Sequence, residues 1–275
     1  MNTGLRMDDS ELYFANLSCS KIEEVLASER RIVLLFPVGS TEPHGPHSPL
    51  CTDLVISEGI CIRVARRLAR DPELRALILP SLSYAVTRYA RAFPGAIHVS
   101  EETLRAMLVE ICGSLIQQGF RLIVLVNNHF EPQHIQTLHR SIDDIESEHG
   151  VLVGYLDLTR KERAVELTEE FRRAECHAGQ YETSLVLAHR PELVDREAMR
   201  SLPYVPVNMA QAIANGAKDF GQMGMDQAYC GSPAAATAEE GEETFGVLAE
   251  MTIELIRELV AGTGGRDLPG LYGRV

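Results

Sequence analysis

The chain contains no tryptophan, and aromatic residues make up only 6% of its 275 positions. Its six cysteines form no CxxC pair, which excludes a zinc ribbon and a compact disulfide framework. No stretch has the roughly 20 consecutive apolar residues that cross a membrane, and the first residues lack the apolar core of a signal peptide. We therefore expect a cytoplasmic protein.

Positive charge is also scarce, since 26 Lys and Arg residues stand against 39 Asp and Glu residues, a net charge of −13. This balance argues against a general affinity for nucleic acid or for an anionic membrane. The sequence also lacks a GxSxG motif, a P-loop and a GxGxxG motif followed by a helix, which argues against serine hydrolases, nucleotide hydrolases and dehydrogenases. We expect a small-molecule substrate as the partner.

Apolar segments typical of strands alternate with segments of helical period. Continuous apolar runs at residues 32–36 and 122–126 are typical of strands buried on both faces, and shorter ones occur at 76–79 and 151–156. Residues 11–30, 54–70, 100–118 and 241–261 show helical spacing. The pattern predicts an α/β fold, a three-layer α/β/α sandwich with a mainly parallel central sheet, in one domain of residues 1–275. A charged helical segment near 160–175, loops over 201–240 and a loose tail from Gly262 complete the prediction.

A polar stretch at residues 36–53 follows the first strong strand and contains Glu42, His44 and Asp53. Glu42 and His44 are one residue apart, so in an extended segment both side chains lie on the same side. The Gly and Pro residues that follow allow the chain to turn back towards Asp53. Zinc and manganese accept this mixture of imidazole and carboxylate ligands. The alternative is an ordinary polar turn in which Asp53 caps a helix.

A second polar cluster, His129 and Glu131, follows the strand at 122–126. Because ligands bind beyond the carboxyl ends of parallel strands, we expect both clusters at one edge of the sheet. Together they offer five ligands, about right for two ions that share a carboxylate. Two such ions can hold a hydroxide between them and polarise a carbonyl or phosphoryl oxygen, so the pattern indicates hydrolysis. A third cluster, with His177 and Glu182, lies at residues 175–185.

Three motifs resemble those of the creatininase (creatinine amidohydrolase) family. They are Gly-Ser-Thr-Glu-Pro-His-Gly-Pro-His at 39–47 with Asp53 following, Asn-His-Phe-Glu at 128–131, and His-Ala-Gly-Gln-Tyr-Glu-Thr-Ser at 177–184. They occur in the family's order, and the similarity spans about residues 30–195. The resemblance implies hydrolysis of an amide or cyclic amide C–N bond. It also suggests a homo-oligomer such as a hexamer.

The resemblance also implies two divalent metal ions per chain, either zinc, manganese or iron. It assigns Glu42, Asp53 and His129 to one ion, and His44, Asp53 and Glu131 to the other. His177 is implied as the acid/base that passes a proton to the leaving nitrogen, beside a catalytic role for Glu131. Glu182 is expected to orient its segment. If Glu131 is not a metal ligand, Glu182 is expected to be the ligand in its place.

The substrate is less defined than the metal ligands. We expect Phe130, and Tyr84 in the long loop at 81–95, to contact it. Creatinine-cleaving enzymes cover their ring-shaped substrate with tryptophan, so the absence of tryptophan points away from creatinine. Peptide-cleaving or deformylase-like family members, and a binding or assembly protein with a dead site, are the alternatives. His47 is expected to support the metal ligands without binding the metal itself. Cys176 could be considered as a thiol nucleophile, but no third group that would orient it is evident in the sequence.

Overall fold

The computed structural model describes residues 9–263, which are built around one four-stranded sheet. The strands are β1 (Arg31–Val38), β2 (Leu74–Ile78), β3 (Leu122–Asn127) and β4 (Gly154–Tyr155). Their order is β2-β1-β3-β4, and every neighbouring pair is parallel. The predicted parallel α/β architecture is confirmed, although the strand expected at 151–156 has only two residues.

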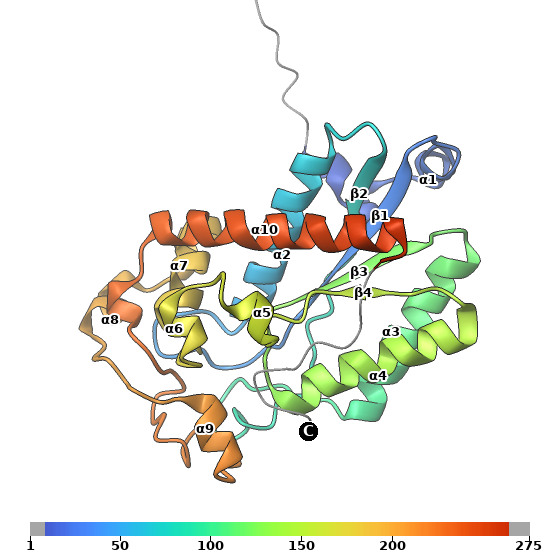
Figure 1. The fold of residues 1–275 in the computed structure, drawn as a ribbon. Helices are drawn as coiled ribbons and strands as arrows, with labels where there is room; N and C mark the ends of the chain where they lie inside the picture. Colours follow the sequence, from blue (N-terminus) through green and yellow to red (C-terminus); the bar gives the residue numbers. More distant parts are fainter. Residues whose placement is uncertain (1–8, 264–275) are drawn as a thin grey trace, which may run out of the picture.

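Helices cover both faces of this sheet (Figure 1). Side chains along β1 alternate between the two faces. Val33 and Leu35 join the core formed with α2 (Thr52–Leu68), α7 (Gln180–His189) and α10 (Ala238–Ala261). Leu34 and Phe36 point to the other face, where α3 (Glu101–Gln117) and α4 (Pro132–His149) pack. The three predicted layers are therefore present, and β1 and β3 are buried between them.

Helix ends fix where the chain enters and leaves the carboxyl edge of the sheet. The side chain of Ser100 accepts a hydrogen bond from the Thr103 amide and caps α3, as its sequence predicts. Helix α4 begins at Pro132, where a missing N–H costs nothing, and ends at Gly150 in the left-handed conformation with φ 64°. The segment between β3 and α4 is therefore only residues 128–131, which holds His129 at the end of the strand.

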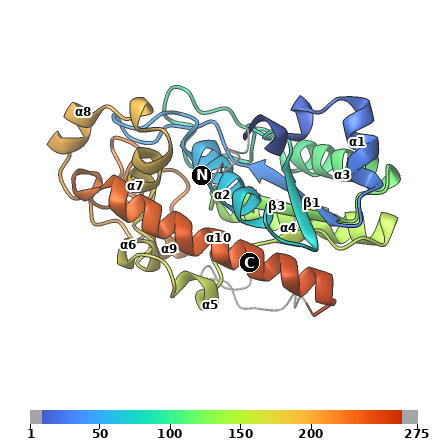
Figure 2. The same ribbon diagram turned by 90° about the horizontal axis from the view of Figure 1, so that it is seen from above.

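Helix α10 fixes the position of α7. Figure 2 shows α10 running along the molecule beside α2 and α7. At Gly241 an added Cβ would lie 2.0 Å from the Ser184 carbonyl oxygen, so only glycine permits the close approach of the two helices. Because α7 carries Glu182, this packing helps to position a polar residue of the third motif.

Several smaller elements differ from the sequence-based expectation. The lead-in helix predicted at 11–30 is shorter, because two 3-10 turns (Asp9–Leu12 and Phe14–Asn16) precede α1 (Cys19–Leu26), which Ser18 caps. The segment 160–175 contains two single-turn helices, α5 (Lys161–Ala164) and α6 (Glu169–Arg172). After α8 (Arg196–Ser201), the region 201–240 is not only loop, because it includes α9 (Met209–Ala214) and a 3-10 turn (Pro233–Ala235).

The predicted loose tail from Gly262 lies almost wholly outside the described residues. Within residues 9–263, no helix combines the length and the apolar character that a bilayer-crossing segment needs.

Candidate metal centre

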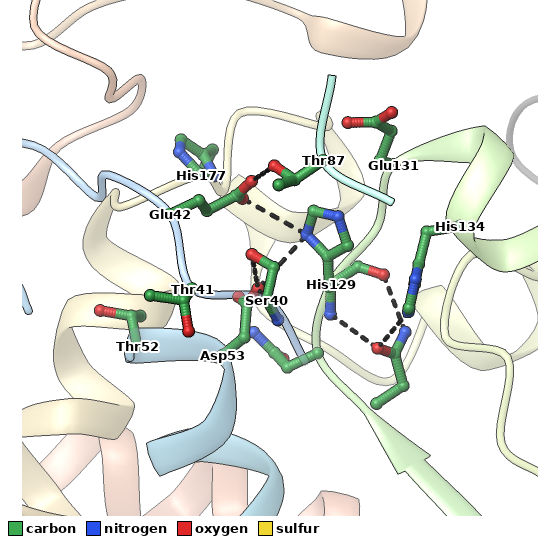
Figure 3. Close-up of polar contacts among 12 residues, drawn as sticks. Ser40, Thr41, Glu42, Thr52, Asp53, Thr87, His129, Glu131, His134 and His177 are labelled. Carbon is green, nitrogen blue, oxygen red and sulfur yellow. Dashed lines mark hydrogen bonds and ion pairs between the residues drawn. The ribbon is translucent and has the colours of Figure 1, made fainter. Parts of the chain in front are cut away.

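The polar motifs meet beyond the carboxyl ends of β1 and β3, where four segments converge (Figure 3). Glu42 and His44 lie on the loop after β1, and Asp53 lies in the first turn of α2. His129 follows β3, and the third motif enters α7 with His177 just before it. The sheet edge thus brings together side chains that are far apart in the sequence.

Three overlapping groups of buried ligand atoms lie there, each with its atoms within 4.8 Å of one another. They are Glu42, Asp53 and His129; His44, Asp53 and Glu182; and Glu42, His44 and His177. Asp53 belongs to the first two groups. Its Oδ2 lies 3.2 Å from His129 Nδ1, and its Oδ1 lies 3.2 Å from His44 Nε2. One carboxylate therefore presents one oxygen to each of two adjacent sites.

The ring of His129 is oriented by a main-chain carbonyl. Its Nε2 donates to the Val86 carbonyl oxygen at 2.8 Å, so the lone pair is on Nδ1. Nδ1 lies 3.3 Å from Glu42 Oε1, on the side facing Asp53. This is the tautomer that an imidazole needs to bind a cation between these two carboxylates.

His44 is held in the complementary way. Its Nδ1 donates to the Glu42 carbonyl oxygen at 2.9 Å, which leaves Nε2 facing Asp53 and Glu182. Nε2 is buried and makes no hydrogen bond, although both carboxylates are near. A buried nitrogen without a partner, aimed at two carboxylate oxygens, fits a metal ligand.

The carboxylates are fixed by donors on their outer sides. Asp53 accepts hydrogen bonds from the amide and the hydroxyl of Ser40, at 3.1 and 3.0 Å. Glu42 accepts one from the Thr87 hydroxyl. Glu182 accepts from the Ala178 amide at 2.7 Å and the Asn128 side chain at 3.0 Å. Such outer contacts hold the ligand atoms in place before any ion binds.

The electrostatics of the cluster also fit a cation. Burial lowers the pKa of His44, but the surrounding carboxylates, Asp53 above all, together outweigh this effect and raise it to about 9. Burial raises the pKa of Glu42, but the charge and hydrogen bond of His129, with the charge of His177, together outweigh this effect and lower it to about 2. Protons on the imidazoles thus neutralise the carboxylates when no ion is bound, and a metal would take over that role.

Glu131 does not belong to any of the three groups. Its Oε2 accepts hydrogen bonds from the amides of Arg88 at 2.6 Å and Tyr89 at 3.2 Å. Its Oε1 is buried without a partner, and burial raises the pKa of this carboxyl to about 7. Figure 3 shows the carboxylate apart from Asp53. The geometry therefore favours Glu182 over Glu131 as the carboxylate beside His44.

His177 lies at the edge of the cluster. Its Nε2 donates to the Pro43 carbonyl oxygen at 3.1 Å, and its ring lies 4.5 Å from the rings of both His44 and Phe220. Burial, and then the charge of His44, lower the pKa of His177 to about 4. Without metal, this imidazole is therefore neutral near pH 7, and its Nδ1 is left to accept a proton.

A pocket opens directly onto this cluster. Its polar wall includes Glu42, Asp53, Asn128, His129, Glu131, His177 and Glu182. The remaining lining residues are mostly apolar: Tyr89, Phe130, Pro132, Cys176, Met209, Ile213, Phe220 and Met223. The buried ligands thus line a pocket and are not sealed inside the core.

Comparison with known proteins identifies the family. The family model described as "Creatininase: Creatinine amidohydrolase" matches residues 15–256. The chain belongs to the creatininase family. A mycofactocin precursor peptide peptidase of Mycolicibacterium smegmatis is 28% identical over 215 residues, 78% of this chain and 79% of that protein. A creatinine amidohydrolase of Pseudomonas putida is 27% identical over 252 residues, which cover 82% of this chain and 89% of that protein.

Solved structures of the family have the same fold. A crystal structure of creatinine amidohydrolase (creatininase) matches with a TM-score of 0.71 and 26% identity, covering 90% of this chain and 97% of that one. Similar creatininase structures include a manganese form and one of Zn-Zn type. This creatininase-family chain therefore shares its fold with hydrolases whose structures carry metals.

The structure also places the other residues singled out in the sequence. Phe130 lines the pocket, whereas Tyr84 does not and is 46% exposed. Tyr89, from the same loop, lies where Tyr84 was expected. His47 Nε2 is 2.8 Å from the Thr183 hydroxyl, so it ties the first motif to α7. Burial raises the pKa of Cys176 well above its usual range, which keeps this thiol protonated and unreactive.

Sequence reasoning missed two sets of residues. The donors on the outer sides of the ligands, such as Thr87 and Asn128, are ordinary polar residues that no spacing distinguishes. The apolar wall formed by Met209, Ile213, Phe220 and Met223 comes from a region predicted as loops. That region's lack of periodicity predicted loops, but it did not identify which of their side chains line the pocket.

Proposed function

We propose that this creatininase-family chain hydrolyses an amide C–N bond with two divalent metal ions. Glu42, Asp53 and His129 hold one ion, and His44, Asp53 and Glu182 hold the other. The observation that carries the proposal is the position of Asp53, whose two oxygens face two imidazole nitrogens at 3.2 Å each. A carboxylate shared in this way is typical of dinuclear hydrolytic sites.

The donor set limits the metal. Three carboxylates and two imidazoles suit zinc, manganese or iron, and the buried Nε2 of His44 has no other partner. When bound, two such ions supply an activated water and polarise the substrate carbonyl. Manganese and Zn-Zn forms of related creatininases support this choice.

His177 is the residue proposed to move the proton. It is buried at the pocket wall, and its Nε2 is engaged by the Pro43 carbonyl, so Nδ1 exchanges the proton. A neutral imidazole first accepts a proton from the attacking water and then donates it to the leaving nitrogen. Glu131 Oε1, buried and without a partner, accepts a hydrogen bond from the reacting water or the amide N–H.

Two histidine variants test these roles, with metal content and amide hydrolysis measured together. We expect His129→Ala to lose metal and activity, because it removes one of three ligands of an ion. We expect His177→Ala to keep its metal and to lose turnover by about 100-fold or more, the usual size of a general acid/base effect.

His139→Ala is the matched control, because His139 pairs with Asp157 and does not line the pocket. It should keep both metal and activity. Equal metal loss in His129→Ala and His177→Ala would contradict the proposed roles. Less than about one ion per chain in the unmodified protein after gentle purification would contradict the dinuclear centre itself.

A further inference from the structure

The lining of the pocket combines two kinds of chemistry. It contains the ligand cluster and also the apolar side chains of Met209, Ile213, Phe220 and Met223, which we call the apolar wall. No lysine or arginine is among the lining residues. A group that enters beside the scissile bond therefore meets hydrocarbon and sulfur on one side, with no basic partner for an acidic substituent.

Main-chain contacts attach this wall to both sides of the pocket. The Phe220 amide donates to the Tyr89 carbonyl oxygen at 3.0 Å, and the Met209 amide donates to the Ala174 carbonyl oxygen at 2.9 Å. The ring of Phe220 also stacks on that of Tyr89, with ring centres 6.4 Å apart. The apolar side chains are thus held over the site by backbone hydrogen bonds and are not merely passing over it.

Phe220 connects the wall to the chemistry. Its ring centre is 4.5 Å from that of His177, the residue proposed to transfer the proton to the leaving nitrogen. The apolar wall thus extends to the residue proposed to transfer the proton. A side chain that flanks the scissile bond is therefore the part of a substrate best placed to meet this wall.

We propose that this wall binds an aliphatic or aromatic side chain next to the scissile bond, so that the substrate is a peptide or linear amide with an apolar residue there. This inference rests on the proposed amide hydrolysis. An acidic side chain at this wall would lie near the Glu131 carboxylate with no Lys or Arg among the lining residues, which is costly. A small polar ring would leave the wall unfilled. The two methionines are flexible, so the wall accepts several apolar shapes.

Hydrolysis of matched peptides tests this preference. The peptides are Ac-Ala-Xaa-Ala-NH₂ with Leu, Phe, Asn or Glu as Xaa, because bonds on both sides of Xaa are then available. We expect kcat/KM for Leu and Phe to exceed that for Asn by about 10-fold or more, with Glu lowest. Equal values across the four peptides would overturn the inference while leaving amide hydrolysis in place.

Variants of α9 separate the wall from general damage. Ile213→Asn should reduce the preference for Leu over Asn to about 3-fold or less, because it puts an amide into the wall. Gln211→Ala is the control, since Gln211 is exposed on the same helix and does not line the pocket. It should keep the wild-type preference. An unchanged preference in Ile213→Asn would overturn the assignment of the wall.

A binding measurement gives a readout that does not need turnover. Titration calorimetry on metal-loaded protein compares 4-methylpentanohydroxamic acid with glutaric acid monohydroxamate, which differ in an apolar or acidic end. We expect the apolar probe to bind about 10-fold more tightly or better. Equal affinity, or no binding of the apolar probe, overturns the inference. Tight apolar binding without cleavage of any peptide would instead refute the proposed hydrolysis and leave the wall assignment standing.

Discussion

Oε2 of Glu182 lies 3.6 Å from Nε2 of His44, and both side chains are buried. The Ala178 amide and the Asn128 side chain hold this carboxylate, so it cannot turn away from the imidazole. Glu131 is held as firmly in another direction, by the amides of residues 88 and 89. The second carboxylate available to His44 therefore comes from α7 and not from the end of β3.

This arrangement predicts different metal contents for two conservative variants. Glu182→Gln should lower the metal content from about two ions per chain to about one, because it replaces a charged ligand of the second site. Glu131→Gln should keep about two ions and lose turnover only. Metal analysis after gel filtration makes the comparison, and each variant is the control for the other. The reverse pattern would assign Glu131 to the metal, as the sequence-based prediction had it.

The two glutamates also show how far the sequence determines the site. Glu42, His44, Asp53 and His129 were predictable because parallel strands end at one edge and their loops must meet there. Glu131 follows His129 by two residues, which predicts a shared direction only in an extended segment. The backbone of Glu131, the residue before α4, is extended (φ −61°, ψ 127°), so the local conformation does not separate the two residues. The distant amides of residues 88 and 89 hold the Glu131 carboxylate instead. A local spacing contains no information on such distant partners.

The apolar wall shows the same limit for the fold. Strong strands such as β1 and β3 were predictable from continuous apolar runs. Helix α9 has six residues, too short for a helical period to be visible. Phe220 reaches the pocket because its amide bonds to the Tyr89 carbonyl oxygen, a contact between distant segments. The homo-oligomeric state and the cytoplasmic location remain predictions.

Metal binding should release protons. Without metal, the charge of Asp53 raises the pKa of His44 to about 9, and burial raises that of Glu182 to about 8. Both groups therefore carry protons at pH 7.5 and must lose them to act as ligands. We expect more than about one proton released per chain at pH 7.5, and fewer at pH 9.5. Calorimetric titration with zinc in buffers of different ionisation enthalpy measures this number. If the measured enthalpy of zinc binding at pH 7.5 is the same in all buffers, no protons are released. That result would contradict the assignment of His44 and Glu182 as ligands.

Glu170 is predicted to be a positioning residue for His177. One of its oxygens accepts from the Tyr181 amide at the start of α7, and the other accepts from the Ser232 amide, both at 2.7 Å. An added Cβ at Gly231 would lie 2.1 Å from this carboxylate, which shows how closely the segments pack. Glu170→Gln replaces one acceptor by a donor that faces an N–H group. We expect a loss of about 1–3 kcal/mol in the free energy of unfolding.

The same variant should lower kcat more than it lowers metal content, because the segment that carries His177 shifts. Of the five proposed ligands only Glu182 lies on that segment, whereas the other four lie on α2 and on the loops after β1 and β3. Urea unfolding, metal analysis and kcat are measured together. Glu169→Gln is the matched control, since Glu169 is exposed and pairs only with Arg173 among the described contacts. If both variants behave alike, Glu170 has no positioning role.

His47 should make the stability of the metal-free protein depend on pH in a defined window. Burial, and then the charge of His44, lower the pKa of His47 to about 4, and its Nε2 contacts the Thr183 hydroxyl at 2.8 Å. In the unfolded chain this histidine takes up a proton below about pH 6.5, whereas in the folded chain it does not until about pH 4. Its contribution to the free energy of unfolding is therefore fully present above pH 6.5 and is lost as pH falls towards 4.

This window can be tested by urea unfolding of the wild type and of His47→Gln, in the presence of a chelator, at several pH values between these limits. As pH falls, the free energy of unfolding of the wild type should decrease by up to about 1.4 kcal/mol per pH unit more than that of His47→Gln. Parallel curves for the two proteins would mean that His47 carries its proton in the folded state.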